Sequence, residues 1–418
     1  MVRRAYVARF EAVAQSFGYL PIETPALEYA DVLLARAGGD AQKEIYRFRD
    51  HGDRDIALRF DLTVPLARFV AVHGASLPLP FKRYQSGKAW RGEKPQKGRY
   101  REFVQFDADV IGSDAAATDL ETLALAARCA EELELGAFRV RVSHRDVIGT
   151  LTRQHGSEGS VVALMRVIDK AGSLSREQLA AALAEHAGAT TVEAVGQLLD
   201  AADHFASGGN AAVLDAMEQV VGQCDGVARL RAILSLTGDQ QPLAGTLQID
   251  PAIMRGFEYY TGMVFETRLE QMPQVGSVGA GGRYDDLIGL YSSQPLPGVG
   301  MSVGIDRVVH ALAEDNRLPD LRPGGDLIVF CLDDALAAEY QRIAGAFRAA
   351  GIRTDVYPTA RKLKAQFAYA EQLRIPFGLF YGEEEHDRGT VKLKELVARR
   401  ERPELALEEA VELVRAAI

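Results

Sequence analysis

Apolar and polar residues alternate along the first third of the chain in a way that is typical of strands interleaved with helices. Residues 81–91 and 101–111 have the alternation of two strands, and the segment GEKPQKG between them contains the proline and glycine of a turn. This pattern predicts an antiparallel hairpin with a long charged tip. Upstream, RDIALRFDLTVPLARFV predicts a strand that enters a helix, with Asp61 and Thr63 at the helix start and Pro65 in its first turn.

The periodicity changes twice further along the chain. Residues 148–245 are rich in Ala, Leu, Glu and Gln at helical spacing, which predicts a helical insertion between two parts of one core, residues 1–147 and 246–320. After the linker NRLPDLRPGGD, strand-like and helix-like segments alternate over residues 325–418. Such alternation predicts parallel strands covered by helices, so we expect a separate α/β domain there.

Composition narrows the class of protein. The 418 residues are enough for two or three domains, and 47% of them are hydrophobic. No apolar run reaches about 18 residues, so we expect no membrane span and a cytoplasmic protein. The three cysteines have no paired spacing, which argues against a disulfide framework or a zinc site. The net charge of −10 disfavours nucleic-acid binding on average, but RKLK at 361–364 and the segment from Lys392 to Arg402 are basic exceptions.

Opposed charges are concentrated in RGEKPQKGRYREFVQFDAD, residues 91–109, which carries Arg91, Glu93 and Arg99 near the expected turn. Strand alternation places one set of side chains on the same face: Arg101, Phe103, Gln105, Asp107 and Asp109. A guanidinium, an aromatic ring, an amide and two carboxylates together suit a ligand with a phosphate, a flat base and a cationic group. The alternative is a solvated hairpin with surface salt bridges.

Three further motifs contain glycine. In MRGFEYYTG, Arg255 can bind a phosphate or carboxylate and Tyr259 and Tyr260 can line a pocket, although core packing of the tyrosine pair is the alternative. GVGMSVGIDRV departs from the dinucleotide fingerprint in its glycine spacing, so we expect a strand that leads into a helix with Arg307 at the junction. GAGGRYDD is consistent with a tight turn that lets the backbone approach a ligand.

The sequence contains no P-loop, kinase signature, nucleophile elbow or zinc-ligand cluster. Its arginine-bearing motifs and glycine turns indicate a polyanion in a closely fitted pocket. Chemistry consistent with these residues is nucleotidyl transfer by positioning and charge stabilisation, without a protein nucleophile.

Taken in order, the motifs resemble those of the histidyl-tRNA synthetase family, within the class II aminoacyl-tRNA synthetases. They are ETP at 23–25, RFDLTVPLARF at 59–69, RGEKPQKGRYREFVQFDADVIG at 91–112, RGFEYYTG at 255–262, GAGGRYDDLIG at 279–289 and GVGMSVGIDR at 298–307. The C-terminal segment KLKAQFAYAEQLRIPFGLFYGEEE also resembles the anticodon-binding domain of that family.

The resemblance implies an α+β fold. Its catalytic domain is a class II antiparallel sheet of about six strands with flanking helices and the helical insertion, followed by an α/β anticodon-binding domain at 325–418. It also implies a homodimer formed partly through the ETP region. The implied reaction converts L-histidine and ATP into histidyl-adenylate and pyrophosphate, with Mg²⁺ bridging the phosphates, and then passes the histidyl group to the terminal adenosine of tRNA(His).

Residue roles follow from the resemblance by position. The implied histidine pocket comprises Asp61, Thr63, Arg91, Gln105, Asp109, Arg255, Tyr259 and Tyr260. The implied ATP site comprises Arg91, Glu93, Arg101, Phe103 and Arg307. Adenine stacks on Phe103, while Arg307 covers the other adenine face and the terminal phosphates. Arg91, Arg255 and Arg307 are the implied catalytic residues, and no protein ligand to a metal is implied.

Two other functions remain open on the sequence. A synthetase-like regulatory subunit of ATP phosphoribosyltransferase senses histidine without charging tRNA, but such subunits usually lose catalytic arginines that this chain keeps. A purely RNA-binding module leaves the adenylate-site residues unexplained. The sequence therefore favours a histidine–tRNA ligase that binds L-histidine, ATP and tRNA(His) and has no membrane partner.

Overall fold

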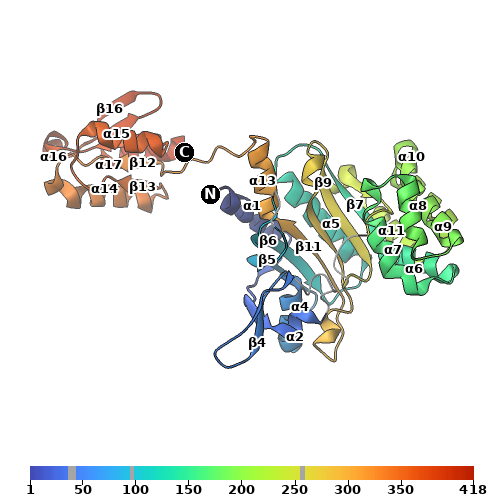
Figure 1. Cartoon of the computed structure of the whole chain (residues 1–418). Coiled ribbons are helices and arrows are strands. Elements are labelled where there is room, and N and C mark those ends of the chain that lie inside the picture. The colour runs from blue at the N-terminus through green and yellow to red at the C-terminus, as the bar shows by residue number, and fades with distance from the viewer. Residues whose placement is uncertain (36–43, 95–97, 255–258) are drawn as a thin grey trace. The chain divides into compact units, whose positions relative to one another are not determined.

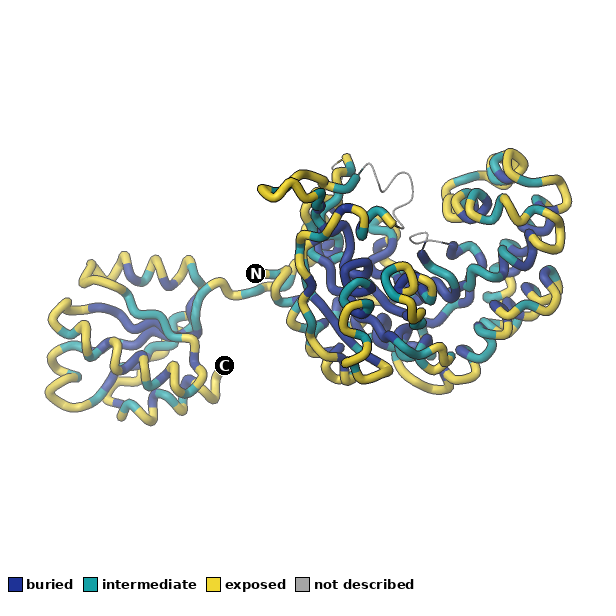
Figure 2. Tube along the Cα trace, turned by 90° about the horizontal axis from the view of Figure 1, so that it is seen from below, coloured by how far each residue is buried: buried dark blue, intermediate teal, exposed yellow. Residues whose placement is uncertain are grey.

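The computed structural model describes residues 1–35, 44–94, 98–254 and 259–418. Its contacts divide the chain into two compact units, Val2–Leu318 and Pro319–Ile418. Figure 1 shows strands and helices in each unit, and Figure 2 shows that buried residues gather in the interior of each unit while exposed residues lie on its outer turns. Among the described residues, no helix is both long enough and apolar enough to cross a membrane.

An eight-stranded sheet forms the centre of the first unit (Figure 1). Its six inner strands pair antiparallel, as expected, and a short strand at each edge pairs parallel. In spatial order the strands are β1 (Leu20–Pro21), β5 (Phe81–Trp90), β6 (Glu102–Ile111), β11 (Gly298–Gly304), β10 (Ser277–Arg283), β9 (Met263–Leu269), β7 (Phe138–His144) and β8 (Leu247–Ile249).

Helices cover one face of this sheet. They are α1 (Val2–Ser16), α5 (Ala116–Glu131) and α13 (Ile305–Glu314), which pack against the strands and against each other. Phe106, Ala108 and Val110 of β6 belong to the core beneath these helices, and the Phe106 ring lies 5.6 Å from that of Phe10 on α1. Because side chains alternate along a strand, the odd-numbered residues of β6 face the opposite side.

The β5–β6 hairpin confirms the expected pair of strands. Arg83 of β5 lies opposite Asp109 of β6. On the other side of β6, β11 places Ser302 opposite Asp107 and Gly300 opposite Asp109. β11 continues directly into α13, which confirms the strand-to-helix reading of GVGMSVGIDRV. Segments far apart in the sequence thus lie side by side around the polar residues of β6.

A second, three-stranded sheet lies next to the first. It contains β2 (Leu27–Tyr29), β4 (Asp55–Leu58) and β3 (Arg47–Arg49), with α2 (Ala30–Leu34) and α4 (Thr63–His73) beside it. The expected strand-to-helix transition is confirmed: the Asp61 carboxylate accepts a hydrogen bond of 3.1 Å from the Val64 amide in the first turn of α4. This bond satisfies an amide that has no intrahelical partner and fixes the Asp61 side chain.

Residues 145–246 contain helices and no strand, as the periodicity predicts. The helices are α6 (Arg145–Gln154), α7 (Val161–Ile168), α8 (Arg176–Ala184), α9 (Ala189–Asp200), α10 (Phe205–Val221), α11 (Asp225–Thr237) and α12 (Leu243–Thr246). Figure 1 shows most of them, in green, gathered beside β7. α11 packs against α5 and β7 and so joins this helical layer to the sheet.

The second unit has a five-stranded sheet in the order β13 (Thr354–Val356), β12 (Leu327–Val329), β14 (Phe377–Phe380), β15 (Val391–Glu395) and β16 (Arg400–Leu405). α14 (Ala337–Ala349) and α17 (Leu407–Ala417) share one core with it, and α15 (Leu363–Gln372) belongs to a second core. The strands β13, β12 and β14 are parallel, but β15 and β16 are antiparallel, so the all-parallel expectation was wrong. The connections before β15 and β16 are too short for a parallel crossover, since α16 (Glu383–Arg388) has only six residues.

Candidate active site

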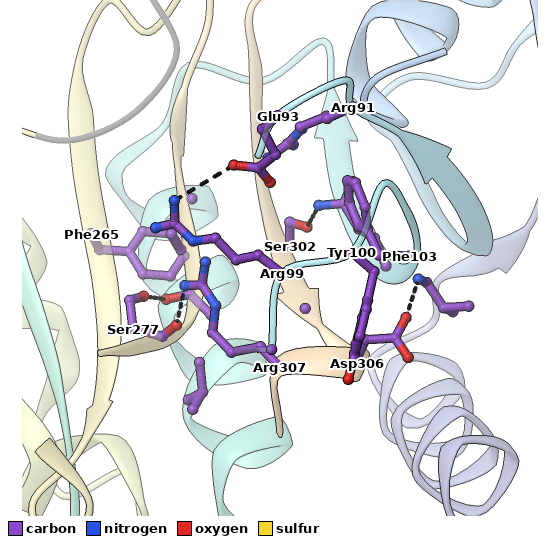
Figure 3. A pocket seen from close by; sticks show the side chains of 18 of the residues that line it. Arg91, Glu93, Arg99, Tyr100, Phe103, Phe265, Ser277, Ser302, Asp306 and Arg307 are labelled. Carbon is purple, nitrogen blue, oxygen red and sulfur yellow. Dashed lines mark hydrogen bonds and ion pairs between the residues drawn. The ribbon is translucent and has the colours of Figure 1, made fainter. Parts of the chain in front are cut away.

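A cavity of about 220 Å³ opens beside β6, β10 and β11 at the start of α13. Figure 3 shows arginine, aromatic and acidic side chains around it. The Arg91 guanidinium lies over the Phe103 ring at 4.9 Å from its centroid, and its Nε donates a hydrogen bond of 3.1 Å to the Phe60 carbonyl. A cation over an aromatic face is a stable arrangement, so these two side chains form one wall of the cavity.

Two further arginines lie at the opposite end of this cavity. Arg307, in the first turn of α13, donates a hydrogen bond of 2.9 Å to the Ser277 carbonyl of β10. Arg99 is 3.6 Å from the Glu93 carboxylate, and Figure 3 shows Arg99 and Arg307 extending toward Ser277 and Phe265. Guanidinium groups are suited to phosphate oxygens, so this end of the cavity fits a polyphosphate.

The floor of the cavity is made by β10, with Gly279, Ala280 and Gly281 among its lining residues. Residues 279–283 of GAGGRYDD therefore lie in a central strand, so the interpretation of these glycines as a tight turn was wrong, and a turn follows only at Asp285 and Asp286. Its glycines have a packing cause: a Cβ at Gly281 would collide with the Gly300 carbonyl and the Phe265 ring. Small residues let the neighbouring strands approach and keep the floor open.

A smaller pocket of about 30 Å³ adjoins this cavity on the same face of β6. It is lined by Asp61, Thr63, Gln105, Asp107, Asp109, Tyr259, Tyr260, Tyr284, Gly300, Met301 and Ser302. Gln105, Tyr260 and Ser302 line both spaces, so a ligand in one can reach a ligand in the other. The Gln105 amide donates a hydrogen bond of 2.8 Å to the Ser302 hydroxyl at this junction.

Three carboxylates are buried in the smaller pocket. Asp61, Asp107 and Asp109 are each 2% exposed. Burial raises the pKa of Asp61 to about 6 and that of Asp107 to about 7, and it raises the pKa of Asp109 as well. Buried carboxylates of this kind favour a ligand that brings positive charge and N–H donors.

The partners of these carboxylates come from segments that are far apart in the sequence. Asp109 receives hydrogen bonds or an ion pair from Tyr284 of the GGRYD segment and from the fully buried Arg83, whose Nη2 is 2.6 Å from Oδ2. Tyr259 donates to Asp61 at 3.3 Å. Burial and the adjacent carboxylates raise the pKa of both Tyr259 and Tyr260, so their hydroxyls stay protonated at neutral pH.

Most residues expected at the site line these two spaces. Arg91, Glu93, Phe103 and Arg307 line the larger cavity, and Asp61, Thr63, Asp109 and Tyr259 line the smaller pocket. Gln105 and Tyr260 line both. Arg101 precedes β6, is exposed and does not line the cavity, and Arg255 lies outside the described residues.

Sequence reasoning gave no individual role to several polar lining residues, among them Arg99, Asp107, Tyr284 and Ser302. Asp107 is an odd-numbered residue of β6, as are Gln105 and Asp109, so strand alternation already placed its side chain on the same face. Ser302 lies on β11 and Tyr284 directly follows β10, and only the pairing of these strands brings both residues to β6. Among residues 1–35, 44–94, 98–254 and 259–418, no group of three His, Cys, Asp or Glu side chains is arranged to bind a metal ion.

Comparison with known proteins identifies the family. A model of the histidyl-tRNA synthetase family matches residues 2–308, and a model of the anticodon binding domain matches residues 326–417. The chain belongs to the histidyl-tRNA synthetase family. The α+β architecture expected from the motifs, with an anticodon-binding α/β domain at the C-terminus, is confirmed.

Relatives cover nearly the whole chain. A histidine–tRNA ligase from Treponema denticola is 38% identical over 99% of this chain and 94% of its own length. One from Helicobacter pylori is 40% identical over 93% of this chain and 89% of its own length.

Solved structures share the fold. The crystal structure of histidyl-tRNA synthetase from Nostoc has a TM-score of 0.85 and 27% sequence identity, and the match covers 100% of this chain and 95% of that one. A structure described as an ATP phosphoribosyltransferase regulatory subunit/histidyl-tRNA synthetase from Bacillus halodurans has a TM-score of 0.74 and 21% identity over 88% of this chain and 92% of that one. At this identity the second match shows the fold alone.

Proposed function

We propose that the protein is a histidine–tRNA ligase, which activates L-histidine with ATP and transfers the histidyl group to the 3′ end of tRNA(His). One observation carries this proposal: an arginine-rich cavity that fits ATP shares Gln105, Tyr260 and Ser302 with an acidic pocket that fits a small cationic amino acid. Family membership and full-length relatives named histidine–tRNA ligase support the same activity.

The smaller pocket takes the amino acid. Asp61 and Asp109 accept hydrogen bonds from the ammonium and imidazole nitrogens, and the Tyr259 and Tyr260 hydroxyls add polar contacts. A pocket built to pair both imidazole nitrogens rejects side chains that lack them, because its buried carboxylates would then be left without donors. Thr63 and Gln105 complete the wall of this pocket.

The larger cavity takes ATP. Adenine stacks on Phe103, with Arg91 at the α-phosphate and Arg99 and Arg307 at the terminal phosphates. Glu93, 3.6 Å from Arg99, orients that guanidinium until phosphate oxygens replace it. We keep Arg101 and Arg255 as proposed ATP and histidine contacts, because the family motifs that contain them, RGEKPQKGRYREF and RGFEYYTG, are intact in the sequence.

Magnesium fits this cavity as an ion carried by ATP. Glu93 and Asp306 are the carboxylates that line the cavity, and Asp306 already accepts a hydrogen bond of 2.7 Å from the Val104 amide. Phosphate oxygens would therefore supply most of the ligands, with Glu93 as the available protein ligand. The ion supplies charge neutralisation to the phosphates, which the arginines supplement.

Activation in this site is a matter of position and charge. The histidine carboxylate lies at the junction of the two spaces and attacks the α-phosphorus, and pyrophosphate leaves. Fixed guanidinium groups offset the negative charge that develops on the phosphoryl oxygens. The chain contributes no nucleophile of its own, and the amide of Gln105, fixed by Ser302, orients the attacking carboxylate.

We assign tRNA reading to the second unit, which the anticodon-binding model matches. Arg361, Lys362 and Lys364 at the start of α15 are exposed and form no ion pair with any described residue. By contrast, Lys392 and Lys394 pair across the β15–β16 hairpin with Glu401, at 3.0 and 2.6 Å. The RKLK segment is therefore the better candidate for phosphate contacts.

We propose that the enzyme is a cytoplasmic homodimer that uses its ETP region as part of the interface. Large apolar side chains are exposed in β1 and β2, which flank Glu23, Thr24 and Pro25, and in β3 of the same three-stranded sheet as β2: they are Leu20, Leu27, Tyr29 and Phe48. Exposed apolar patches of this kind mark protein contacts. A Leu27→Asp/Phe48→Asp variant should be monomeric in analytical ultracentrifugation if the wild type is dimeric through this surface.

Pyrophosphate exchange tests the assigned function. The wild type should catalyse ATP–pyrophosphate exchange with L-histidine and with none of the other nineteen amino acids, and it should then charge tRNA(His) from total tRNA. A histidine-sensing regulatory subunit would bind histidine without exchange or charging. Exchange with a different amino acid, or binding without exchange, would contradict the proposal.

A further inference from the structure

Asp107 is a buried residue of the smaller pocket to which the roles above assign no task. It lies on β6 between Gln105 and Asp109, and its side chain is 2% exposed. Its Oδ1 atom forms no hydrogen bond with any described residue. A buried carboxylate oxygen without a donor costs free energy, so the pocket is suited to a ligand that supplies one.

The other two carboxylates of the pocket already have protein partners. Asp109 contacts Tyr284 and Arg83, and Asp61 contacts the Val64 amide and Tyr259. A ligand nitrogen therefore competes with existing donors at these residues, whereas it meets an unoccupied oxygen at Asp107.

The surroundings of Asp107 fix its position. Ser302 lies directly opposite on β11 and is itself bound by Gln105 at 2.8 Å. Arg83, fully buried on β5, is paired with Asp109, and its charge also acts on Asp107. The Nε and Nη1 atoms of Arg83 have no hydrogen-bond partner among the described residues. One guanidinium, ion-paired with Asp109 and acting on Asp107 only through its charge, faces two carboxylates, so this end of the pocket is suited to an imidazole N–H donor.

We propose that Asp107 is a specificity-determining residue for histidine, whose Oδ1 accepts a hydrogen bond from an imidazole N–H of the substrate. Arg83 is the positioning residue that keeps the Asp107–Asp109 pair in place. The inference rests on the proposed function, since it names a further residue of the same amino-acid site. An amino acid without a side-chain N–H leaves the Asp107 oxygen buried and unpaired, which is the physical basis for its rejection.

The test compares Asp107→Asn with the wild type in pyrophosphate exchange. The variant should raise the KM for L-histidine about 10-fold, as expected when a charged hydrogen-bond acceptor is replaced by a neutral amide, and should leave the KM for ATP within about twofold. Glu266→Gln is the matched control, because Glu266 is a fully buried carboxylate of the same sheet that lines neither space. It should leave both constants near those of the wild type.

Four outcomes decide the matter. A selective rise in the histidine constant supports the proposal. An unchanged histidine constant, or equal rises for histidine and ATP, overturns it. If Asp107→Asn does not fold, Asp107→Ser is tested in the same way. If neither variant folds while Glu266→Gln does, Asp107 has a structural role and the proposal is overturned. A wild type that shows no histidine-dependent exchange contradicts the proposed function itself, which is a separate result.

Discussion

Gly300 of β11 lies directly opposite Asp109 of β6, and the space that a side chain at Gly300 would need is occupied by the Asp109 carboxylate. Asp109 can therefore occupy its position in the smaller pocket only because residue 300 has no Cβ. Glycine here is explained by close approach of a functional side chain rather than by backbone conformation.

Replacing this glycine should damage amino-acid binding selectively. Gly300→Ala displaces Asp109 and should raise the KM for histidine by at least about 10-fold in pyrophosphate exchange, with a smaller effect on the KM for ATP, because a buried carboxylate loses its position. Gly345→Ala is the control, since a Cβ at Gly345 in α14 would meet no atom within 4 Å. Equal constants for Gly300→Ala and the wild type would show that Asp109 does not contact the substrate.

Charge stabilisation by arginine gives the second prediction. Arg307→Ala removes the guanidinium next to Ser277 and should lower kcat for pyrophosphate exchange about 10²- to 10³-fold, as for other lost charge-stabilising groups. Arg317→Ala serves as a control, because Arg317 is exposed beyond the end of α13 and lines neither space. An Arg307→Ala enzyme with wild-type kcat would rule out this role.

The pH dependence of stability gives the third prediction. Burial raises the pKa of Asp107 from 3.8 to about 7, so the folded state binds a proton that the unfolded state releases. The resulting stabilisation is fully present below about pH 4 and is lost as pH rises through 7. Asp107→Asn stays neutral throughout, so its free energy of unfolding relative to the wild type should increase between pH 5 and pH 8.

Urea unfolding at the two pH values measures this difference. The chain has a single tryptophan, Trp90 at the end of β5, so tryptophan fluorescence reports unfolding of the first unit alone. This avoids the difficulty that a two-unit chain does not unfold in one step. A difference between variant and wild type that does not change with pH would mean that Asp107 titrates normally in the folded protein.

Local patterns predicted the elements that are stabilised locally. The β5–β6 hairpin and the start of α4 at Asp61 and Thr63 were readable because alternation, turn residues and helix-start residues all agree there. The same parity argument placed Phe103, Gln105 and Asp109 on one face of β6, and they do line the two spaces. It failed at Arg101, since β6 begins only at Glu102 and Arg101 is exposed.

Features that depend on the pairing of strands far apart in the sequence could not be predicted from the sequence. Arg83 looks like an ordinary charged strand residue until its pairing opposite Asp109 shows why it is fully buried. The glycines of β10 indicate a turn in isolation, and only the neighbouring Gly300 carbonyl and Phe265 ring explain them within a strand. Tyr284 and Ser302 reach the pocket for the same reason. The family motifs nevertheless contain most of the residues that line the two spaces, because they cover β6, β11 and most of β10.

The fourth prediction concerns the separate functions of the two units, amino-acid activation in the first and tRNA binding in the second. A chain that ends at Leu318 keeps both spaces of the candidate site, which are lined by residues of the first unit. It should retain histidine-dependent pyrophosphate exchange within about 10-fold of the full chain and lose charging of tRNA(His) by a larger factor, because the anticodon contacts are removed. Parallel loss of both activities, with loss of the Trp90 unfolding transition, would indicate that the first unit does not fold alone.

The most direct test of the central claim is a crystal structure of the wild type with L-histidine and a non-hydrolysable ATP analogue. The imidazole should lie among Asp61, Asp107 and Asp109, the adenine should stack on Phe103, and the phosphates should lie beside Arg99 and Arg307. The histidine carboxylate should lie next to the α-phosphate at Gln105. Ligands bound elsewhere, or a histidine whose imidazole contacts none of the three carboxylates, would contradict it.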